Sequence, residues 1–254
     1  GLLYASVPEK GTVLRISPDG SQIGAIHGFQ EPLALAVSSS LKRVYVGDVG
    51  DGSVKVIDQQ GAFLYSLGKG AREFGMPSDI AVASDGSAFV TDSTNDVVKA
   101  YHPDGTFQFS FGGSGTSAGK MLFPTGITID DGNGEIYVVD HTNGRVEVFD
   151  RSGTFVRSFS GFGSRAGNLT RPQGIWVAKG QVYVADAFQS NVVCFDGNGA
   201  FLGKIGLFGS GAGQLKIPKD LAMSGGKLFV SSAGNRRIEV FTPYDPLGMR
   251  VEPP

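Results

Sequence analysis

Residues 124–159 read PTGITIDDGNGEIYVVDHTNGRVEVFDRSGTFVRSF. The stretch holds four segments of about five residues, 124–129, 136–140, 146–150 and 155–159, each rich in Val, Ile, Tyr or Phe. Clusters of Gly, Asn and Asp separate them, which is the pattern of short strands joined by tight turns. None of the segments has the 3.6-residue apolar period of a useful helix. The stretch therefore predicts a four-stranded antiparallel sheet.

The same pattern recurs along the chain, each time behind an anchor proline. The five anchors lie 45, 47, 48 and 46 residues apart, at Pro32, Pro77, Pro124, Pro172 and Pro218. Four strands repeated at this period are typical of a β-propeller, in which each sheet is one blade. Before Pro32 the pattern continues backwards for three strands only, Leu2 to Ser6, Thr12 to Ser17 and Gln22 to His27.

The fold class that follows is all-β, a six-bladed β-propeller of four-stranded antiparallel blades whose first blade lacks its innermost strand. We expect residues 1–254 to form one propeller domain. Its predicted blades are 2–27, 32–67, 77–111, 124–159, 172–205 and 218–251.

The first blade therefore has an open inner edge, and an unpaired edge is costly and adhesive. Three sources could cover it: residues outside this sequence, a rearranged C-terminus, or a strand donated by another chain. Donation would make the protein a possible homo-oligomer or filament subunit.

Composition excludes several classes. Net charge is −2 and the pI about 5.9, so the chain has no long-range electrostatic attraction for nucleic acid. Nucleic acid is therefore not the expected partner. One cysteine, Cys194, cannot form an intrachain disulfide, and no Cys/His cluster suits zinc. No apolar run is long enough for a membrane helix, so we expect no membrane insertion.

The chain resembles the NHL-repeat family of six-bladed propellers. The resemblance rests on the Pro-x-Gly/Asp-Ile-x-Val anchors, on YVVDHTN at residues 137–143, and on glycine-rich connectors such as GLFGSGAGQLKIPKDL at 206–221. It implies the fold over essentially the whole chain. It leaves function open, because family members include protein-binding modules, RNA-binding domains, sensors and a zinc-dependent peptide-amidating lyase. Many bacterial relatives are exported, which favours a periplasmic or extracellular location.

Acids close the second strand of four blades, at Asp48, Asp92, Asp140 and Asp186, with Ser232 in the last. They resemble a ligand set, but Asp and Asn side chains also fix tight turns by accepting backbone N–H groups, and we expect that role here. The three histidines, His27, His102 and His141, occupy inequivalent repeat positions, unlike the zinc triad that the lyases imply. We predict no catalytic residue, no metal site and no cofactor.

A small-ligand site is expected at the central mouth, where the anchor strands begin. Asp79 and Asp220 lie two residues after their prolines, and Thr125, Gln173 and Lys219 lie one residue after theirs. Two distant carboxylates are too few for a hard cation, so a polar rim is the expected role.

A binding face is expected where the turns after the second strands meet the connectors after the fourth strands, since antiparallel strands reverse direction. That face collects most Lys and Arg, whereas the opposite turns are rich in Asp. The candidate partner-binding residues on it are Arg72, His141, Arg145, Arg165, Phe188 and Arg236.

The function that these observations favour is a non-catalytic binding or scaffold propeller that engages a protein or peptide through loops on one face. Propeller loops vary over a rigid frame, which is how such frames acquire binding surfaces. One alternative is a metal-dependent lyase or lactonase-like enzyme with its site at the central mouth. Another is RNA binding on the basic face.

Overall fold

The structure is a computed structural model, and it describes residues 2–242. The chain divides into two compact units, residues 1–114 and 115–254. Strands account for nearly all of its regular structure, and the helical segments described are three single 3-10 turns, η1 (Pro8–Lys10), η2 (Ser93–Asn95) and η3 (Ala233–Asn235). The described residues contain no helix long and apolar enough to span a membrane.

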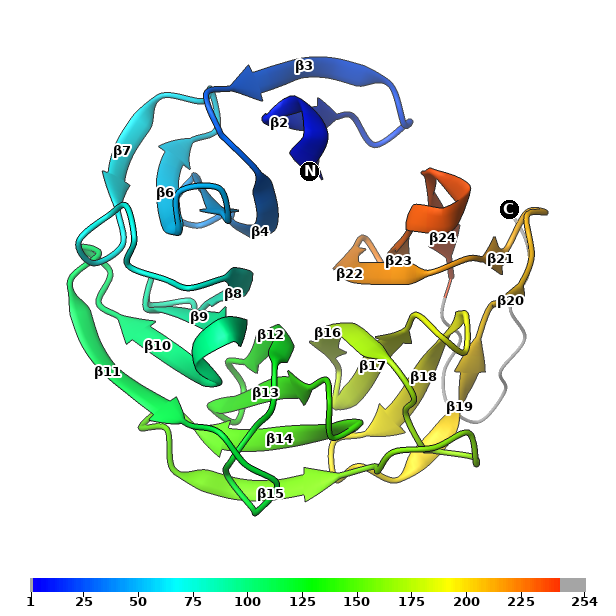
Figure 1. The fold of residues 1–254 in the computed structure, drawn as a ribbon. Coiled ribbons are helices and arrows are strands. Elements are labelled where there is room, and N and C mark those ends of the chain that lie inside the picture. Colours follow the sequence, from blue (N-terminus) through cyan, green and yellow to red (C-terminus); the bar gives the residue numbers. More distant parts are fainter. Residues whose placement is uncertain (1, 243–254) are drawn as a thin grey trace. The chain divides into compact units, whose positions relative to one another are not determined.

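The first unit contains three antiparallel sheets, and in each the strands pair in chain order (Figure 1). Its strands are β1 (Leu3–Val7), β2 (Thr12–Ile16) and β3 (Gln22–His27); β4 (Pro32–Ser38), β5 (Arg43–Asp48), β6 (Ser53–Asp58) and β7 (Phe63–Ser66); and β8 (Pro77–Val82), β9 (Ala88–Asp92), β10 (Val97–Tyr101) and β11 (Phe107–Gly112).

The second unit also contains three large antiparallel sheets with strands in chain order. Its strands are β12 (Pro124–Asp130), β13 (Glu135–Asp140), β14 (Arg145–Asp150) and β15 (Phe155–Phe159); β16 (Pro172–Ala178), β17 (Gln181–Asp186), β18 (Asn191–Asp196) and β19 (Phe201–Ile205); and β22 (Pro218–Ser224), β23 (Lys227–Ser232) and β24 (Arg237–Phe241).

These six sheets confirm the predicted all-β, six-bladed propeller class. The first sheet has three strands, as expected for a blade without its innermost strand. The turn after β1 supports the assignment of β1 as a second strand. In two other sheets the second strand is followed by a 3-10 turn, η2 or η3, that ends in a left-handed residue, Asp96 or Arg236. The turn η1 after β1 ends in the same way, at Gly11. Within residues 2–242 the only strand paired with β1 is β2. The fourth strand expected around residues 247–251 lies outside the described residues.

Apolar side chains between neighbouring sheets form the core. In the second unit, Val148 and Phe159 of one sheet share a buried cluster with Ile175 and Val184 of the next. Packing is also close along the first strands. A Cβ added to Gly174 of β16 would lie 2.7 Å from the Cα of Asp220 in β22, so the two strands touch backbone to backbone. Stacked sheets of this kind position the loops at their ends.

One feature of the connectors was not predicted. The connector between β19 and β22 folds back on itself through a short parallel pair, β20 (Leu207–Phe208) and β21 (Gln214–Leu215). The preceding connector makes a similar parallel bridge between Phe162 and Leu169. These two glycine-rich connectors of the second unit are therefore ordered loops whose ends pair in the same direction.

Candidate functional site

The acids that end the second strands of four blades are fully buried and anchor the connector before the anchor proline. Asp48, Asp92, Asp140 and Asp186 all have no exposed surface. Asp48 accepts hydrogen bonds from the backbone N–H groups of Gln30 and Glu31, 2.9 and 2.7 Å away. These acids therefore have a structural role, as expected. Most of their backbone donors lie about 17 residues earlier in the chain.

Asp186 accepts hydrogen bonds from both the connector and the following turn. Its carboxylate accepts backbone N–H groups of Thr170 (2.6 Å) and Arg171 (3.2 Å) in the connector, and of Phe188 (3.1 Å) and Gln189 (3.0 Å) in the following turn. The side-chain amide of Gln189 adds a fifth donor at 3.1 Å. One buried carboxylate thus fixes the connector and the turn against each other.

The third strands carry the charges that face these acids. Lys55 pairs with Asp48 at 2.5 Å, and Arg145 Nε donates to Asp140 at 2.9 Å. Burial opposes the charge of Asp48, but the hydrogen bonds from Lys55 and from the backbone outweigh it and lower its pKa. The predicted partner residue Arg145 is thus engaged inside the fold, since it also donates to the backbone oxygen of Lys120 at 2.8 Å.

Glu147 differs from Lys55, because it is a fully buried acid at the place that Lys55 holds in β6, and the buried Glu239 holds the same place in β24. Its Oε2 accepts the backbone N–H of Gly119 at 3.3 Å, and its Oε1 lies 2.8 Å from Arg145 without a well-aligned hydrogen bond. Burial raises the pKa of Glu147 to about 7 despite the attraction of Arg145, and Asp140 adds to the rise.

The residues predicted for a small-ligand site fall into two groups. Asp79 belongs to the first unit, and Thr125, Gln173, Lys219 and Asp220 belong to the second. Within the second unit the structure brings three of them together: Thr125 Oγ1 donates to the backbone oxygen of Gln173 at 2.9 Å, and Lys219 Nζ lies 3.5 Å from Gln173 Oε1. A ligand-binding role for these residues stays a prediction.

Asp79 and Asp220 share a local role that the sequence did not reveal. Each caps the backbone just after its anchor proline, where the pairing register of the strand shifts: Asp79 Oδ1 accepts the N–H of Ile80, and Asp220 Oδ1 accepts that of Leu221, both at 2.8 Å. Asp220 reaches solvent, yet the protein atoms crowded around it disfavour its charge and raise its pKa to about 6.

His141 was predicted for the partner-binding face, and it lies beside Gln173 of the residues predicted for a small-ligand site. Its Nδ1 is 2.6 Å from the backbone oxygen of Pro172 and 3.1 Å from the side-chain nitrogen of Gln173. Its ring also contacts Phe123 edge-on, with 5.9 Å between the centroids. The turn of one blade therefore meets the first strand of the next.

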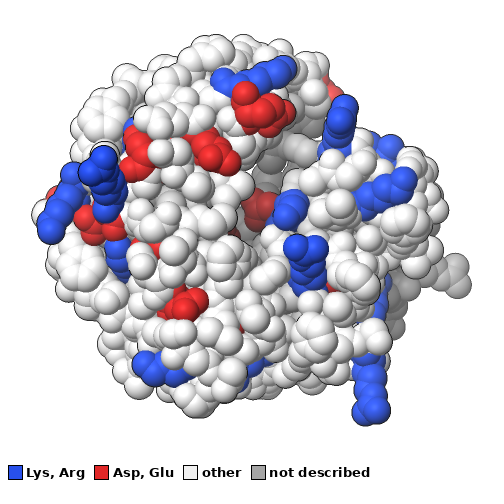
Figure 2. All heavy atoms as spheres, viewed as in Figure 1, with Lys and Arg blue, Asp and Glu red and all other residues white. Residues whose placement is uncertain are grey.

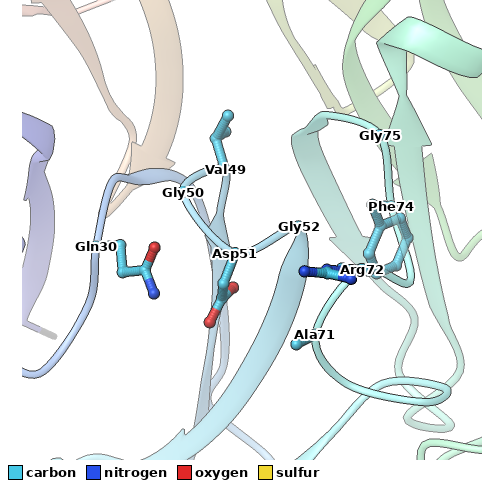
Figure 3. Close-up of a pocket in the computed structure, with 9 residues that line it drawn as sticks. All are labelled: Gln30, Val49, Gly50, Asp51, Gly52, Ala71, Arg72, Phe74 and Gly75. Atoms are coloured by element: carbon cyan, nitrogen blue, oxygen red, sulfur yellow. The ribbon is translucent and has the colours of Figure 1, made fainter.

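A shallow cleft of about 470 Å³ lies in the first unit, between the turn after β5 and the connector to β8 (Figure 3). Two backbone bonds join these segments, from Arg72 N–H to Asp51 oxygen at 2.8 Å and from Phe74 N–H to Gly52 oxygen at 2.9 Å. The predicted partner residue Arg72 lines the cleft and is exposed, with a left-handed φ of 63°. The cleft's acid, Asp51, is bound by Lys55 at 2.6 Å.

The second unit carries exposed apolar side chains on its loop face, by which we mean the turns 141–144, 187–190 and 233–236 and the connectors 115–123, 160–171 and 206–217. Phe162, Phe188 and Phe208 are 68%, 71% and 71% exposed. Phe188 was a predicted partner residue, whereas Phe162 and Phe208 were not. The sequence feature that could have identified Phe162 and Phe208 as partner residues was their position in glycine-rich connectors.

The same face presents basic side chains and contains no Asp or Glu. Of the acids that border it, Asp140, Glu147, Asp186 and Glu239 are buried and Asp220 is exposed. Figure 2 shows Lys and Arg atoms (blue) over the region of β22 and β23. The exposed bases of the loop face are Lys120, Arg165, Arg171 and Arg236, and the exposed Lys219 and Arg237 lie next to it in β22 and β24.

No group of three or more His, Cys, Asp or Glu side chains suited to a metal occurs within residues 2–242. His27, for example, lies 3.2 Å from the hydroxyl of Thr12, in the first unit, whereas His141 belongs to the second. Cys194 is buried, and burial raises the pKa of its thiol to about 12.

Comparison with known families matches residues 121–149, which span β12, β13 and most of β14, to the NHL repeat. The protein is an NHL-repeat β-propeller. The resemblance drawn from the anchors and from YVVDHTN is thereby confirmed. No curated protein matches the chain significantly.

Solved structures similar to this NHL-repeat propeller include proteins of different activities. A chain in the crystal structure of the nidogen/laminin complex aligns with a TM-score of 0.77 and 21% identity, over 94% of this chain and 88% of that one. Virginiamycin B lyase from Staphylococcus aureus aligns at 0.69 and 15%, over 94% and 75%. A streptogramin B lyase aligns at 0.68 and 12%, over 96% and 80%. At these identities the likeness shows the fold alone.

Proposed function

We propose that this NHL-repeat propeller is a non-catalytic binding module that engages a protein or peptide through the loop face of its second unit. The observation that carries the proposal is the combination of exposed phenylalanines with exposed arginines and lysines, on loops that contain no Asp or Glu. Aromatic residues and arginine are the side chains that most often dominate the binding energy of protein interfaces.

The loops that carry these side chains are held rigidly, which favours binding because little conformational freedom is lost. Gly144 of one turn packs against the connector, since a Cβ placed there would lie 2.8 Å from the Phe162 Cα. The backbone N–H of Ala187 donates to the Arg171 oxygen at 3.0 Å, so Phe188 is held beside Arg171. Apolar and basic groups are thus presented together.

The matching partner is a segment with acidic and apolar side chains, because the exposed charge on the loop face is mainly positive. The likeness to a chain of the nidogen/laminin complex is compatible with a protein partner. The rival hypothesis is a lyase with a metal at the central mouth, and the fold that this chain shares with two lyases is compatible with it as well.

The test is selection of peptides from a random 12-residue display library on the immobilised protein, followed by synthesis of the enriched peptides. We expect enrichment of Asp and Glu next to aromatic or aliphatic residues. Phe188→Ser and Arg165→Ser should each weaken binding of those peptides about tenfold, a typical loss for an interface anchor. Phe63→Ser is the matched control, since Phe63 is 62% exposed on β7 of the first unit.

Binding that falls equally with Phe63→Ser and Phe188→Ser would refute the assignment of the face, and so would the absence of any enrichment. Stoichiometric zinc, magnesium or calcium in the purified protein, together with turnover of a cyclic peptide or lactone that ceases on chelation, would favour the lyase hypothesis instead.

A further inference from the structure

The cleft of the first unit lies on a turn whose preceding connector is short. The connector in front of β4 covers residues 28–31, whereas those in front of β12, β16 and β22 cover residues 113–123, 160–171 and 206–217. The longer connectors fold back onto the turn that follows the second strand of their blade. Residues 28–31 do not reach as far over the turn 49–52, and the cleft lies there, between Gln30 and the connector to β8 (Figure 3).

One position of the turn shows what fills this space in other blades. It lies three residues after the end of the second strand, and in three blades it holds an amide side chain that donates to a backbone oxygen of the connector. These bonds run from Asn143 to Gly115 (3.0 Å), from Gln189 to Asn168 (2.9 Å) and from Asn235 to Gly209 (3.0 Å). The same position in turn 49–52 holds Asp51, whose carboxylate can only accept. The cleft therefore offers an acceptor where the other turns offer a donor.

The charges around Asp51 leave an excess of negative charge. Asp48 and Asp51 share one cation, since Lys55 Nζ lies 2.5 Å from the first carboxylate and 2.6 Å from the second. Asp48 is fully buried, whereas the side chain of Asp51 is 20% exposed. The hydroxyl of Ser53 also donates to Asp51, but a carboxylate has about four acceptor sites. Asp51 is thus the acid that a ligand in the cleft can reach.

A positive charge faces the cleft from its other wall. Arg72 is exposed, and within residues 2–242 its guanidinium makes no hydrogen bond or ion pair. The neighbouring acid, Glu73, is occupied, because it accepts the backbone N–H of Lys69 at 3.1 Å and the hydroxyl of Tyr101 at 3.0 Å. The guanidinium is therefore available to an acceptor in the cleft.

The two walls are held beside each other. The backbone N–H of Arg72 donates to the backbone oxygen of Asp51 at 2.8 Å, and Figure 3 shows Gln30 and Arg72 on opposite sides of Asp51. The side-chain amide of Gln30 has no hydrogen bond to the described part of the chain either. Val49 and Ala71 add apolar lining, and the volume of about 470 Å³ lies within the range of small-ligand sites.

We infer that this cleft binds a small zwitterion of the amino-acid type, with its ammonium group at Asp51 and its carboxylate at Arg72. A carboxylate accepts charge-assisted hydrogen bonds from an ammonium, and the planar guanidinium donates two parallel bonds to a carboxylate. The amide of Gln30 can donate to one end of the ligand or accept from the other. The inference goes beyond the proposed function, because the cleft belongs to the first unit and the loop face to the second.

The test is titration of L-leucine into the isotope-labelled full chain, followed by NMR through the backbone amide signals of Gly50, Gly52 and Gly75, which line the cleft. Two matched ligands each lack one charge: leucinamide has no carboxylate, and N-acetyl-leucine has no ammonium. We expect saturable shifts with leucine and about tenfold weaker binding of each matched ligand, because each loses one charge-assisted contact.

Two variants assign the contacts. Arg72→Gln should weaken leucine binding about tenfold and leave leucinamide binding unchanged, whereas Asp51→Asn should weaken leucine binding about tenfold and leave N-acetyl-leucine binding unchanged. Two other turns carry Asn at the position of Asp51, so the fold should tolerate it. Lys69→Gln and Glu31→Gln are the controls, since both remove exposed charges near the cleft that do not line it.

The absence of a saturable shift with leucine would overturn the inference. Equal binding of leucine and leucinamide would do so too, and so would equal weakening by Arg72→Gln and Lys69→Gln. Tighter binding of N-acetyl-leucine than of leucine would refute the zwitterion class. The ligand series needs no variant, so it decides even where a variant fails to fold. Leucine binding by a protein that enriches no peptide would keep this site and refute the proposed function.

Discussion

Removing the carboxylate of Asp186 is expected to destabilise the second unit and to disorder the proposed binding surface. The side chain is fully buried and accepts five N–H donors, four from the backbone and one from Gln189. Hydrogen bonds to a charged group contribute about 1.5–3 kcal/mol each, but water entering the space left by Asp186→Ala would replace several of them. We therefore expect the free energy of unfolding to fall by about 3–5 kcal/mol, the range for a disrupted buried charge network.

Asp186→Asn should not rescue this loss fully, because the new NH2 group must face at least two N–H donors in either orientation. The assay is urea unfolding followed by the fluorescence of the one tryptophan, Trp176, which lies on β16 of the same blade. Hydrogen exchange at Thr170 and Phe188 reports whether the connector and the turn separate.

Asp196→Ala is the matched control in the same blade. Asp196 fixes the turn at the opposite end of β18 by accepting the N–H groups of Asn198 and Ala200, and it is partly exposed. The loss on Asp196→Ala should stay below about 1 kcal/mol. A loss below 1 kcal/mol for Asp186→Ala, or one equal to that of the control, would refute the anchoring role.

Three further predictions concern single positions. Ser232→Asp should lower the free energy of unfolding by about 1–3 kcal/mol in urea titrations, because the buried Ser232 hydroxyl both accepts the Lys216 N–H at 3.0 Å and donates to the Lys216 oxygen at 3.2 Å, whereas a carboxylate can only accept; a gain of stability would contradict this. Between pH 4.5 and about 7 the native Glu147 binds more protons than Glu147 in the unfolded chain, so its contribution to the free energy of unfolding falls as pH rises through that window. At pH 8 the variant Glu147→Gln should therefore be more stable than the unchanged protein, by at most about 3 kcal/mol. Equal dependence of the two free energies of unfolding on pH would contradict this. Gly144→Ala should lower the melting temperature by several degrees, since Gly144 has φ of 66° and an added Cβ would lie 2.8 Å from the Leu169 oxygen; an unchanged melting temperature would show that the turn relaxes freely.

The architecture could be predicted because the repeat is periodic and its signals are local. Each anchor proline begins a strand in the structure, and Pro124 begins β12. The tight turns and the alternation of apolar residues determine strand ends without long-range information. For the same reason the missing strand of the first blade was visible from the three segments before Pro32.

The candidate sites depend on contacts that span blades, which a single repeat does not encode. Gln173 and His141 come from neighbouring blades, and their contact requires the turn of one blade to reach the first strand of the next. The repeat pattern also does not predict whether a phenylalanine in a connector packs inward or faces solvent. Phe74 is buried and Phe162 is 68% exposed, although both lie in connectors. Glycine-rich loops allow both outcomes.

The most direct test of peptide binding at the loop face is a hydrogen–deuterium exchange footprint of an enriched peptide on the intact protein. The account predicts slower exchange in the peptide's presence in connector 160–171 and in turn 187–190, with turn 197–200 at the other end of the same blade unchanged. Protection confined to turn 197–200, or to the first unit, would contradict it.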